Sequence, residues 1–234
     1  SGAKYLWNSL KVTFLYSMGE ILVTMVGGML LALLFNRMTR SFGLMRAFVF
    51  VPKYVAMSSA AVVFLWILNT DSGVLNYLLQ CIGLPAVDWL NQQSTALPSV
   101  LMLTGWRVIG YGMMIYLSAM MGISQEYYEA ASLDGANGVQ KFFRITLPLL
   151  SPTTLFLLVT TFLSSMKVFQ SVDILTSGGP ARSTEVFVYL IYRYAMVDFR
   201  MDRAATAAVM FFLILLVITV LTMKVSDRSV TYDS

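Results

Sequence analysis

Five long apolar stretches, separated by short polar ones, dominate this sequence. They cover residues 10–35, 47–68, 97–121, 149–172 and 204–223. A helix needs about 20 apolar residues to cross the hydrocarbon core of a bilayer, and each stretch reaches that length. The sequence therefore predicts an all-α fold, a polytopic transmembrane helical bundle with five spans.

Composition agrees with a membrane protein and argues against several other classes. The chain is 58% hydrophobic and 12% charged, whereas soluble domains average about 45–50% apolar and 25% charged residues. There is no histidine, which removes His-based triads, HExxH zinc sites and the usual proton shuttle. Scattered basic residues without interleaved aromatics argue against nucleic-acid binding. No metal-ligand cluster or phosphate-binding GxxxxGK[ST] loop occurs, so a partner must bring any nucleotide site.

A polar, helix-forming island interrupts the apolar pattern at residues 124–147. Ser124 is placed to cap a first helix. Gly135, which readily adopts a left-handed conformation, is expected to end that helix. A second helix over residues 139–145 is expected to end before Pro148, which has no N–H to donate. On these residues alone the island is either a docking element for another protein or an ordinary amphipathic loop.

Polar side chains inside the apolar stretches mark a candidate substrate path. An ionisable group at mid-membrane costs about 2.5–3.5 kcal/mol on insertion scales, so it faces a partner or a wet cavity. The candidate residues are Glu20, Arg107, Tyr111, Ser164, Lys167 and Gln170. Lys53 is a weaker candidate because its side chain can reach the interface. On a continuous helix, Ser164, Lys167 and Ser171 share one face.

Two explanations of these polar residues stay open. They can line a passage, where aromatic and hydroxyl groups suit a sugar. They can also serve packing, with Ser and Thr bonding between helices and Glu20 neutralising Arg107 or a charge on another subunit.

Basic residues in short loops predict the sidedness of the chain. They are Arg37, Arg40 and Arg46 after the first stretch, Lys141 and Arg144 in the island, and Lys224 and Arg228 after the last stretch. The loop at 69–96 has none. The island and the C-terminus are therefore expected in the cytoplasm, with residues 173–203 as an external loop that contains a short helix at 186–196. Four arginines in that external loop disagree with the rule, and four acidic residues accompany them.

A more specific pattern lies in the island and downstream of it. Its parts are Glu129-Ala130-Ala131, Asp134-Gly135, Ile145-Thr146-Leu147-Pro148 and Leu175-Thr176-Ser177-Gly178-Gly179-Pro180. These residues resemble the EAA-motif permease subunits of binding-protein-dependent ABC importers, and within them the carbohydrate type of the maltose and glycerol-phosphate importers. The resemblance extends from about Trp7 to Val225. One departure is Ser124, where the family usually has proline; a capping serine serves the same end of the helix.

The resemblance implies a single permease domain of the type I ABC importer kind over residues 1–234. It forms half of a translocation path in a bacterial or archaeal cell (inner) membrane, and a second permease subunit, usually a different chain, forms the other half. The family's first span is expected to precede residue 4. The solute, an oligosaccharide, polyol or sugar phosphate, would arrive on an extracytoplasmic solute-binding protein.

The resemblance also implies site residues and partners. The island becomes the coupling helices, which contact a dimer of ATPase subunits through Glu129, Ala130, Ala131, Asp134, Gly135 and Phe142. Gly178, Gly179 and Pro180 would contact the binding protein. ATP and Mg belong to the ATPase, so this chain needs no cofactor and is not an enzyme.

Other functions are weighed against this one. An ion-coupled secondary transporter is expected to show inverted repeats, and no convincing repeat is visible. A membrane enzyme lacks a nucleophile–base pair here. A purely structural subunit differs from a permease only in a transport assay. The residues do not identify the solute, because Arg107 and Lys167 suit an anion while a neutral oligosaccharide or another small solute fits as well.

Overall fold

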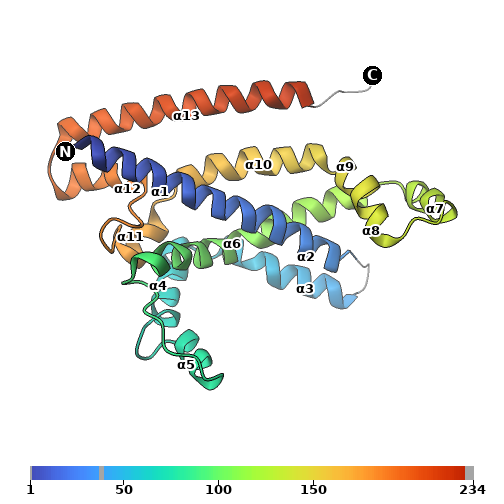
Figure 1. Ribbon diagram of the computed structural model, residues 1–234, viewed down its shortest axis with the longest axis horizontal. Helices are drawn as coiled ribbons and strands as arrows, with labels where there is room; N and C mark the ends of the chain where they lie inside the picture. The colour runs from blue at the N-terminus through green and yellow to red at the C-terminus, as the bar shows by residue number, and fades with distance from the viewer. Residues whose placement is uncertain (1, 37–39, 230–234) are drawn as a thin grey trace. The chain divides into compact units, whose positions relative to one another are not determined.

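The computed structural model describes residues 2–36 and 40–229, and within these residues it contains helices and no strand (Figure 1). The all-α prediction is confirmed. Three helices are long and apolar enough to cross a membrane, namely Gly2–Leu34, Gln93–Met121 and Met201–Thr222. Two bent pairs reach that length together, Gly43–Tyr54 with Met57–Ile67 and Gly138–Leu149 with Ser151–Met166, so the described residues offer up to five spans. Arg37, used above for sidedness, lies outside the described residues.

The chain divides into two compact units. Unit 1 comprises residues 1–20, 54–106 and 162–220, and unit 2 comprises residues 21–53, 107–161 and 221–234. The division cuts through the long apolar helices, so most spans contribute to both units. The prediction of a single permease domain stays a prediction.

Unit 1 is built around buried side chains from both ends of the chain. Its elements are most of α1 (Gly2–Leu22), α4 (Met57–Ile67), α5 (Val74–Cys81), the first half of α6 (Gln93–Met121), the end of α10 (Ser151–Met166), α11 (Gln170–Thr176), α12 (Phe187–Tyr192), a π-helical turn η4 (Arg193–Val197) and most of α13 (Met201–Ser229). Tyr16 and Leu103 are buried in one cluster, and Phe187 in a second cluster stacks on Phe211 with ring centroids 4.9 Å apart. The helix predicted at 186–196 is present as α12 and η4.

Unit 2 packs its helices at very close range. Its elements are a π-helical turn η1 (Val23–Gly27), α2 (Gly28–Leu34), α3 (Arg40–Phe50), a 3₁₀ turn η2 (Val51–Tyr54), the second half of α6, α7 (Gln125–Leu133), α8 (Gly138–Lys141), a π-helical turn η3 (Phe142–Thr146), α9 (Leu147–Leu149) and most of α10. A Cβ added to Gly28 would lie 2.8 Å from the carbonyl carbon of Gly112. Small residues therefore let α2 and α6 meet backbone to backbone.

The stretch at 47–68 is not the single straight span that the sequence predicts. The first helical part ends at Tyr54 and the second begins at Met57. The two parts meet at an angle of 103°. Pro52 is buried in the 3₁₀ turn η2, and Ala56 has an extended ψ of 134°. A proline removes a helical hydrogen bond, and sharp bends usually occur beside one.

The stretch at 149–172 is also broken, and this overturns a predicted polar face. Helix α10 ends at Met166, where Lys167 and Val168 donate to carbonyls three residues earlier, at 3.2 and 3.1 Å. Phe169 then leaves the helical region with φ −145° and ψ −64°. Lys167 therefore lies at the break, and Ser164 and Ser171 belong to different helices.

Pro148 does not end the second island helix, contrary to the prediction. The π-helical turn η3 lets the Leu147 N–H bond the carbonyl of Phe142, and the helix then continues through α9 to Leu149. Pro148 follows this π-helical turn directly, as the second residue of α9.

Candidate functional site

The island at 124–147 folds as two capped helices joined by a left-handed turn. The Ser124 hydroxyl accepts a hydrogen bond from the Glu126 N–H at 3.3 Å, which confirms the predicted N-cap. Gly135 has φ +78°, the conformation in which glycine has no steric penalty. Asn137 and Gln140 form a capping box that starts α8.

Side-chain hydrogen bonds hold the two island helices to each other. The hydroxyls of Tyr128 in α7 and Thr146 in η3 lie 2.9 Å apart. The Ser132 hydroxyl donates to the Tyr128 carbonyl at 2.7 Å and accepts from the Lys141 amine at 2.5 Å. The island is therefore a preformed element, and a partner that docks on it does not have to order it first.

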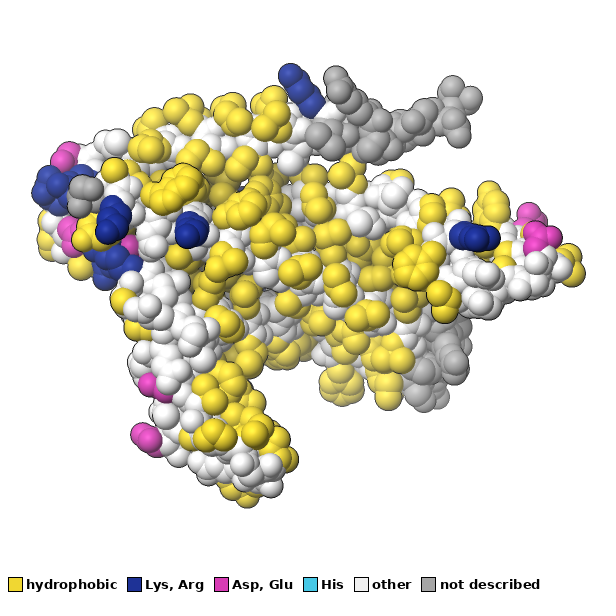
Figure 2. Space-filling model, in the orientation of Figure 1, with side chains coloured by type: hydrophobic (Ala, Val, Ile, Leu, Met, Phe, Trp, Pro, Cys, Tyr) yellow, Lys and Arg dark blue, Asp and Glu magenta, His cyan; other side chains and the backbone are white. Residues whose placement is uncertain are grey.

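The outward side of the island carries large apolar side chains. The exposed fractions are 57% for Tyr127, 90% for Leu133, 66% for Val139 and 60% for Phe143. We call these four residues the island patch. Figure 2 shows acidic side chains beside apolar ones in the region of α7. Several large apolar side chains exposed on one short polar element are typical of a protein interaction surface.

Most of the predicted coupling residues are accessible. Glu129, Ala130, Asp134 and Gly135 are exposed, and Ala131 is half-buried. Phe142 is also half-buried and packs against the core of unit 2, while its neighbour Phe143 points outward. Their rings lie 5.0 Å apart in an edge-to-face contact. Sequence reasoning chose Phe142 and missed the island patch, although the large apolar residues that flank the Gly135 turn were a visible signal.

The predicted binding-protein loop is accessible at some of its positions and buried at others. Gly178 is buried, and an added Cβ would lie 2.7 Å from the Tyr189 ring. Gly179 and Pro180 are half-buried, whereas Ser177 and Ala181 are exposed. Gly178 therefore serves close packing, and Ser177 and Ala181 are the more exposed positions of this loop.

A buried acidic residue lies next to this loop. Glu185 has no exposed surface, and its two carboxylate oxygens bond Arg182 at 3.2 Å and Arg193 at 2.6 Å. Burial raises the pKa of the neighbouring Tyr189 and Tyr194 hydroxyls above the ordinary tyrosine value. In the sequence these arginines bear only on sidedness, and their separation along the chain gives no sign of a shared partner.

The candidate path residues fall into the two units. In unit 2, Arg107 donates to the Lys53 carbonyl at 3.2 Å, and the Lys53 amine lies 4.8 Å from the centre of the Tyr111 ring. In unit 1, Glu20 is buried and accepts a hydrogen bond from the Tyr16 hydroxyl. The unit 1 candidates Ser164, Lys167 and Gln170 are exposed. Unit 2 thus brings Lys53 next to Arg107 and Tyr111, which the sequence places one turn apart on another segment.

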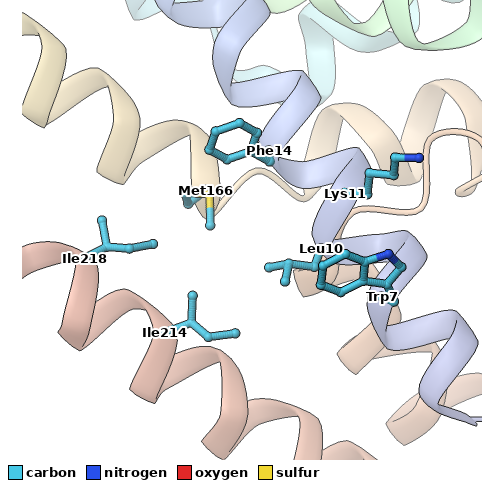
Figure 3. Close-up of a pocket in the computed structure, with 7 residues that line it drawn as sticks. All are labelled: Trp7, Leu10, Lys11, Phe14, Met166, Ile214 and Ile218. Atoms are coloured by element: carbon cyan, nitrogen blue, oxygen red, sulfur yellow. The ribbon is translucent and has the colours of Figure 1, made fainter.

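An apolar groove of about 330 Å³ in unit 1 does not resemble a sugar site (Figure 3). Its lining residues are Trp7, Leu10, Lys11, Phe14, Met166, Ile214 and Ile218. Figure 3 shows the Lys11 amine pointing away from the α13 isoleucines. Sugar recognition needs convergent polar groups, and this lining does not supply them. In the described part of the chain, acidic residues and Cys81 form no group that could hold a metal ion.

Comparisons with known proteins agree with the island and the helical fold. The family model described as "binding-protein-dependent transport system inner membrane component" matches residues 24–232. The probable ABC transporter permease protein YurN of Bacillus subtilis is 34% identical over 93% of this chain and 76% of its own length. The sn-glycerol-3-phosphate transport system permease protein UgpA of Agrobacterium fabrum is 34% identical over 96% of this chain and 77% of its own length.

A solved structure supports the same assignment. A chain of a bacterial ABC transporter for import of the acidic polysaccharide alginate superposes with a TM-score of 0.84 at 29% identity, over 94% of this chain and 78% of that chain. A bacterial alginate ABC transporter in complex with a periplasmic protein that holds an alginate pentasaccharide matches equally well, with a TM-score of 0.84. The family match, the relatives and the fold agree, and the chain belongs to the membrane-embedded permease components of binding-protein-dependent ABC importers.

Proposed function

We propose that this permease imports a carbohydrate or a related solute with energy from ATP. A dimer of ATPase subunits, which binds ATP and Mg, docks on the island from the cytoplasm. A solute-binding protein docks on the external loop at residues 173–203. A second permease subunit, expected to be a different chain, completes the passage in the bacterial or archaeal inner membrane.

The island carries this proposal. It is a preformed helical element, and its island patch exposes four large apolar side chains that a helix in contact with water alone would not favour. ATP-driven closure of the ATPase dimer would move the island as a rigid body, because its two helices are bonded to each other. Coupling of this kind requires that ATP and solute each favour one of two states of the transporter.

Capture of the ATPase through the island tests the proposal. We would replace exposed Ala130 by cysteine in a Cys81→Ser chain, add a bifunctional thiol crosslinker to native membranes, and identify the adduct by mass spectrometry. An adduct with a nucleotide-binding subunit is expected. The unaltered chain is the matched control, because its own exposed Cys81 lies on α5, in the loop expected outside. Solute flux by the isolated chain without any ATPase would favour a secondary transporter instead.

The cations of unit 2 favour an acidic solute. Arg107 donates a hydrogen bond to the Lys53 carbonyl, and the Lys53 amine lies over the Tyr111 ring. UgpA is named for sn-glycerol 3-phosphate, and the superposed transporter imports an acidic polysaccharide. We therefore propose an anionic sugar or polyol phosphate as the preferred class.

Replacing Arg107 by alanine tests this preference. Uptake of anionic probes, sn-glycerol 3-phosphate and alginate oligosaccharide, is expected to fall about tenfold, the effect of losing one charged hydrogen bond. Uptake of maltose, a neutral probe, would be unaffected by a loss of charge. If the variant assembles normally and takes up every probe as fast as the unaltered chain does, Arg107 does not belong to the substrate path.

A further inference from the structure

The loop at 177–184, between α11 and α12, has a backbone that most residues avoid. Ser177, Ala181 and Arg182 have φ values of 49°, 46° and 63°. Residues other than glycine seldom adopt these left-handed values. Such a conformation persists only where surrounding contacts hold it, and it is often found at clamps and switch regions.

Arg182 connects this loop to α1. Its guanidinium lies 3.7 Å from the centre of the Tyr5 ring and donates to Glu185 at 3.2 Å. Its backbone carbonyl accepts a hydrogen bond from the Asn8 amide at 3.1 Å. Tyr5 and Asn8 both belong to α1. One residue of the strained loop is thus attached to the first long helix by its side chain and by its backbone.

Glu185 holds Arg182 from the other side. The fully buried carboxylate also bonds Arg193 at 2.6 Å, in the turn that follows α12. Beside it, the Thr184 hydroxyl donates to the Gly179 carbonyl at 2.7 Å, and the Phe187 N–H donates to the Thr13 hydroxyl of α1 at 2.8 Å. The loop, α12 and α1 are therefore joined by polar contacts around one acidic side chain.

Stability alone is a weak explanation for this cluster. A buried ion pair can often be replaced by apolar residues of similar volume without loss of stability. A carboxylate with two arginines instead fixes a geometry, because its two oxygens each require a donor in a set direction. The geometry fixed here is that of a strained loop with an accessible surface.

We propose that Glu185, Arg182 and Arg193, which we call the outer clamp, hold the loop in the shape that the solute-binding protein docks on and attach that loop to α1. Docking on the loop then acts directly on α1. Glu185 is buried and does not touch the docked protein, so it is a positioning residue. The inference rests on the proposed docking of a binding protein at this loop.

Glu185→Gln tests the outer clamp in the complete transporter reconstituted in nanodiscs. The probe is the purified, solute-loaded binding protein of the same transporter, titrated while ATP hydrolysis is measured. The concentration that gives half-maximal stimulation is expected to rise about tenfold, as for loss of one important interface contact. The rate at saturation and the amount of bound ATPase subunits are expected to stay unchanged. A lower rate at saturation without a shift in that concentration, or no change at all, would overturn the proposal.

A pair of variants at Ala181 tests the same idea without touching the outer clamp. Ala181 is exposed and has φ +46°. Glycine adopts this value freely, so Ala181→Gly should behave as the unaltered chain. Proline is fixed near −65°, so Ala181→Pro should reproduce the tenfold shift. This pair decides the matter if Glu185→Gln does not assemble, and equal behaviour of the two variants would refute the proposal. Absence of stimulation in the unaltered transporter would instead count against the proposed function.

Discussion

Replacing Leu133 by aspartate is expected to abolish ATP-driven uptake while the permease still folds. Leu133 is 90% exposed at the end of α7, so the change removes little internal packing. In the assembled transporter the same side chain is expected to be covered by the ATPase, where an unpaired carboxylate is costly. Central interface residues often contribute about 2–4 kcal/mol, so ATPase affinity should fall by a factor of about 100. Co-purification of ATPase subunits and ATP-dependent uptake measure the effect.

A matched substitution separates this effect from a general effect of added charge. Leu84→Asp changes the same residue type at a half-exposed position in the loop between α5 and α6. That loop is expected on the opposite side of the membrane, so ATPase co-purification should be unchanged. If Leu133→Asp retained the ATPase as well as Leu84→Asp does, the island patch would not be the docking surface.

The island was largely predictable because local interactions determine it. The cap at Ser124 and the left-handed turn at Gly135 depend on residues within one turn, and both are present. The exposure of Phe143 rather than Phe142 was not predictable, since it depends on which ring reaches the core of unit 2. Helical periodicity does not show which of two adjacent aromatic residues faces the core.

The span pattern was predictable, but its breaks were not. Hydropathy gives the length of an apolar segment, but it does not give the direction of the helix axis along that segment. The 103° bend after Tyr54 and the end of α10 before Lys167 both occur inside stretches that are apolar overall. Lys167, which was expected on a helix face, therefore lies at a break between two helices. The attachment of the outer clamp to α1 was equally hidden, because Tyr5 and Arg182 are brought together by tertiary packing alone.

The close contact of α2 with α6 leads to the second large expected effect. Gly28→Leu should prevent unit 2 from forming, because even a Cβ at this position would lie 2.8 Å from the carbonyl carbon of Gly112 and 2.9 Å from the Met113 nitrogen. Both neighbouring atoms belong to the backbone and cannot move aside as a flexible side chain does. Overpacking in a well-packed core costs about 1–3 kcal/mol for small additions, and a whole leucine side chain exceeds that. Loss of the monodisperse peak in size-exclusion chromatography of the detergent-extracted permease would report the failure.

Gly43→Leu is the matched control, since a Cβ on Gly43 of α3 meets nothing within 4 Å. Leucine is a better helix former than glycine by roughly 0.8 kcal/mol, so this variant should be as stable as the unaltered chain or more so. Gly28→Ala should lie between the two, with a lower melting temperature and retained assembly. A normal elution profile for Gly28→Leu would mean that α2 and α6 separate easily, and the close backbone contact would then not be what holds unit 2 together.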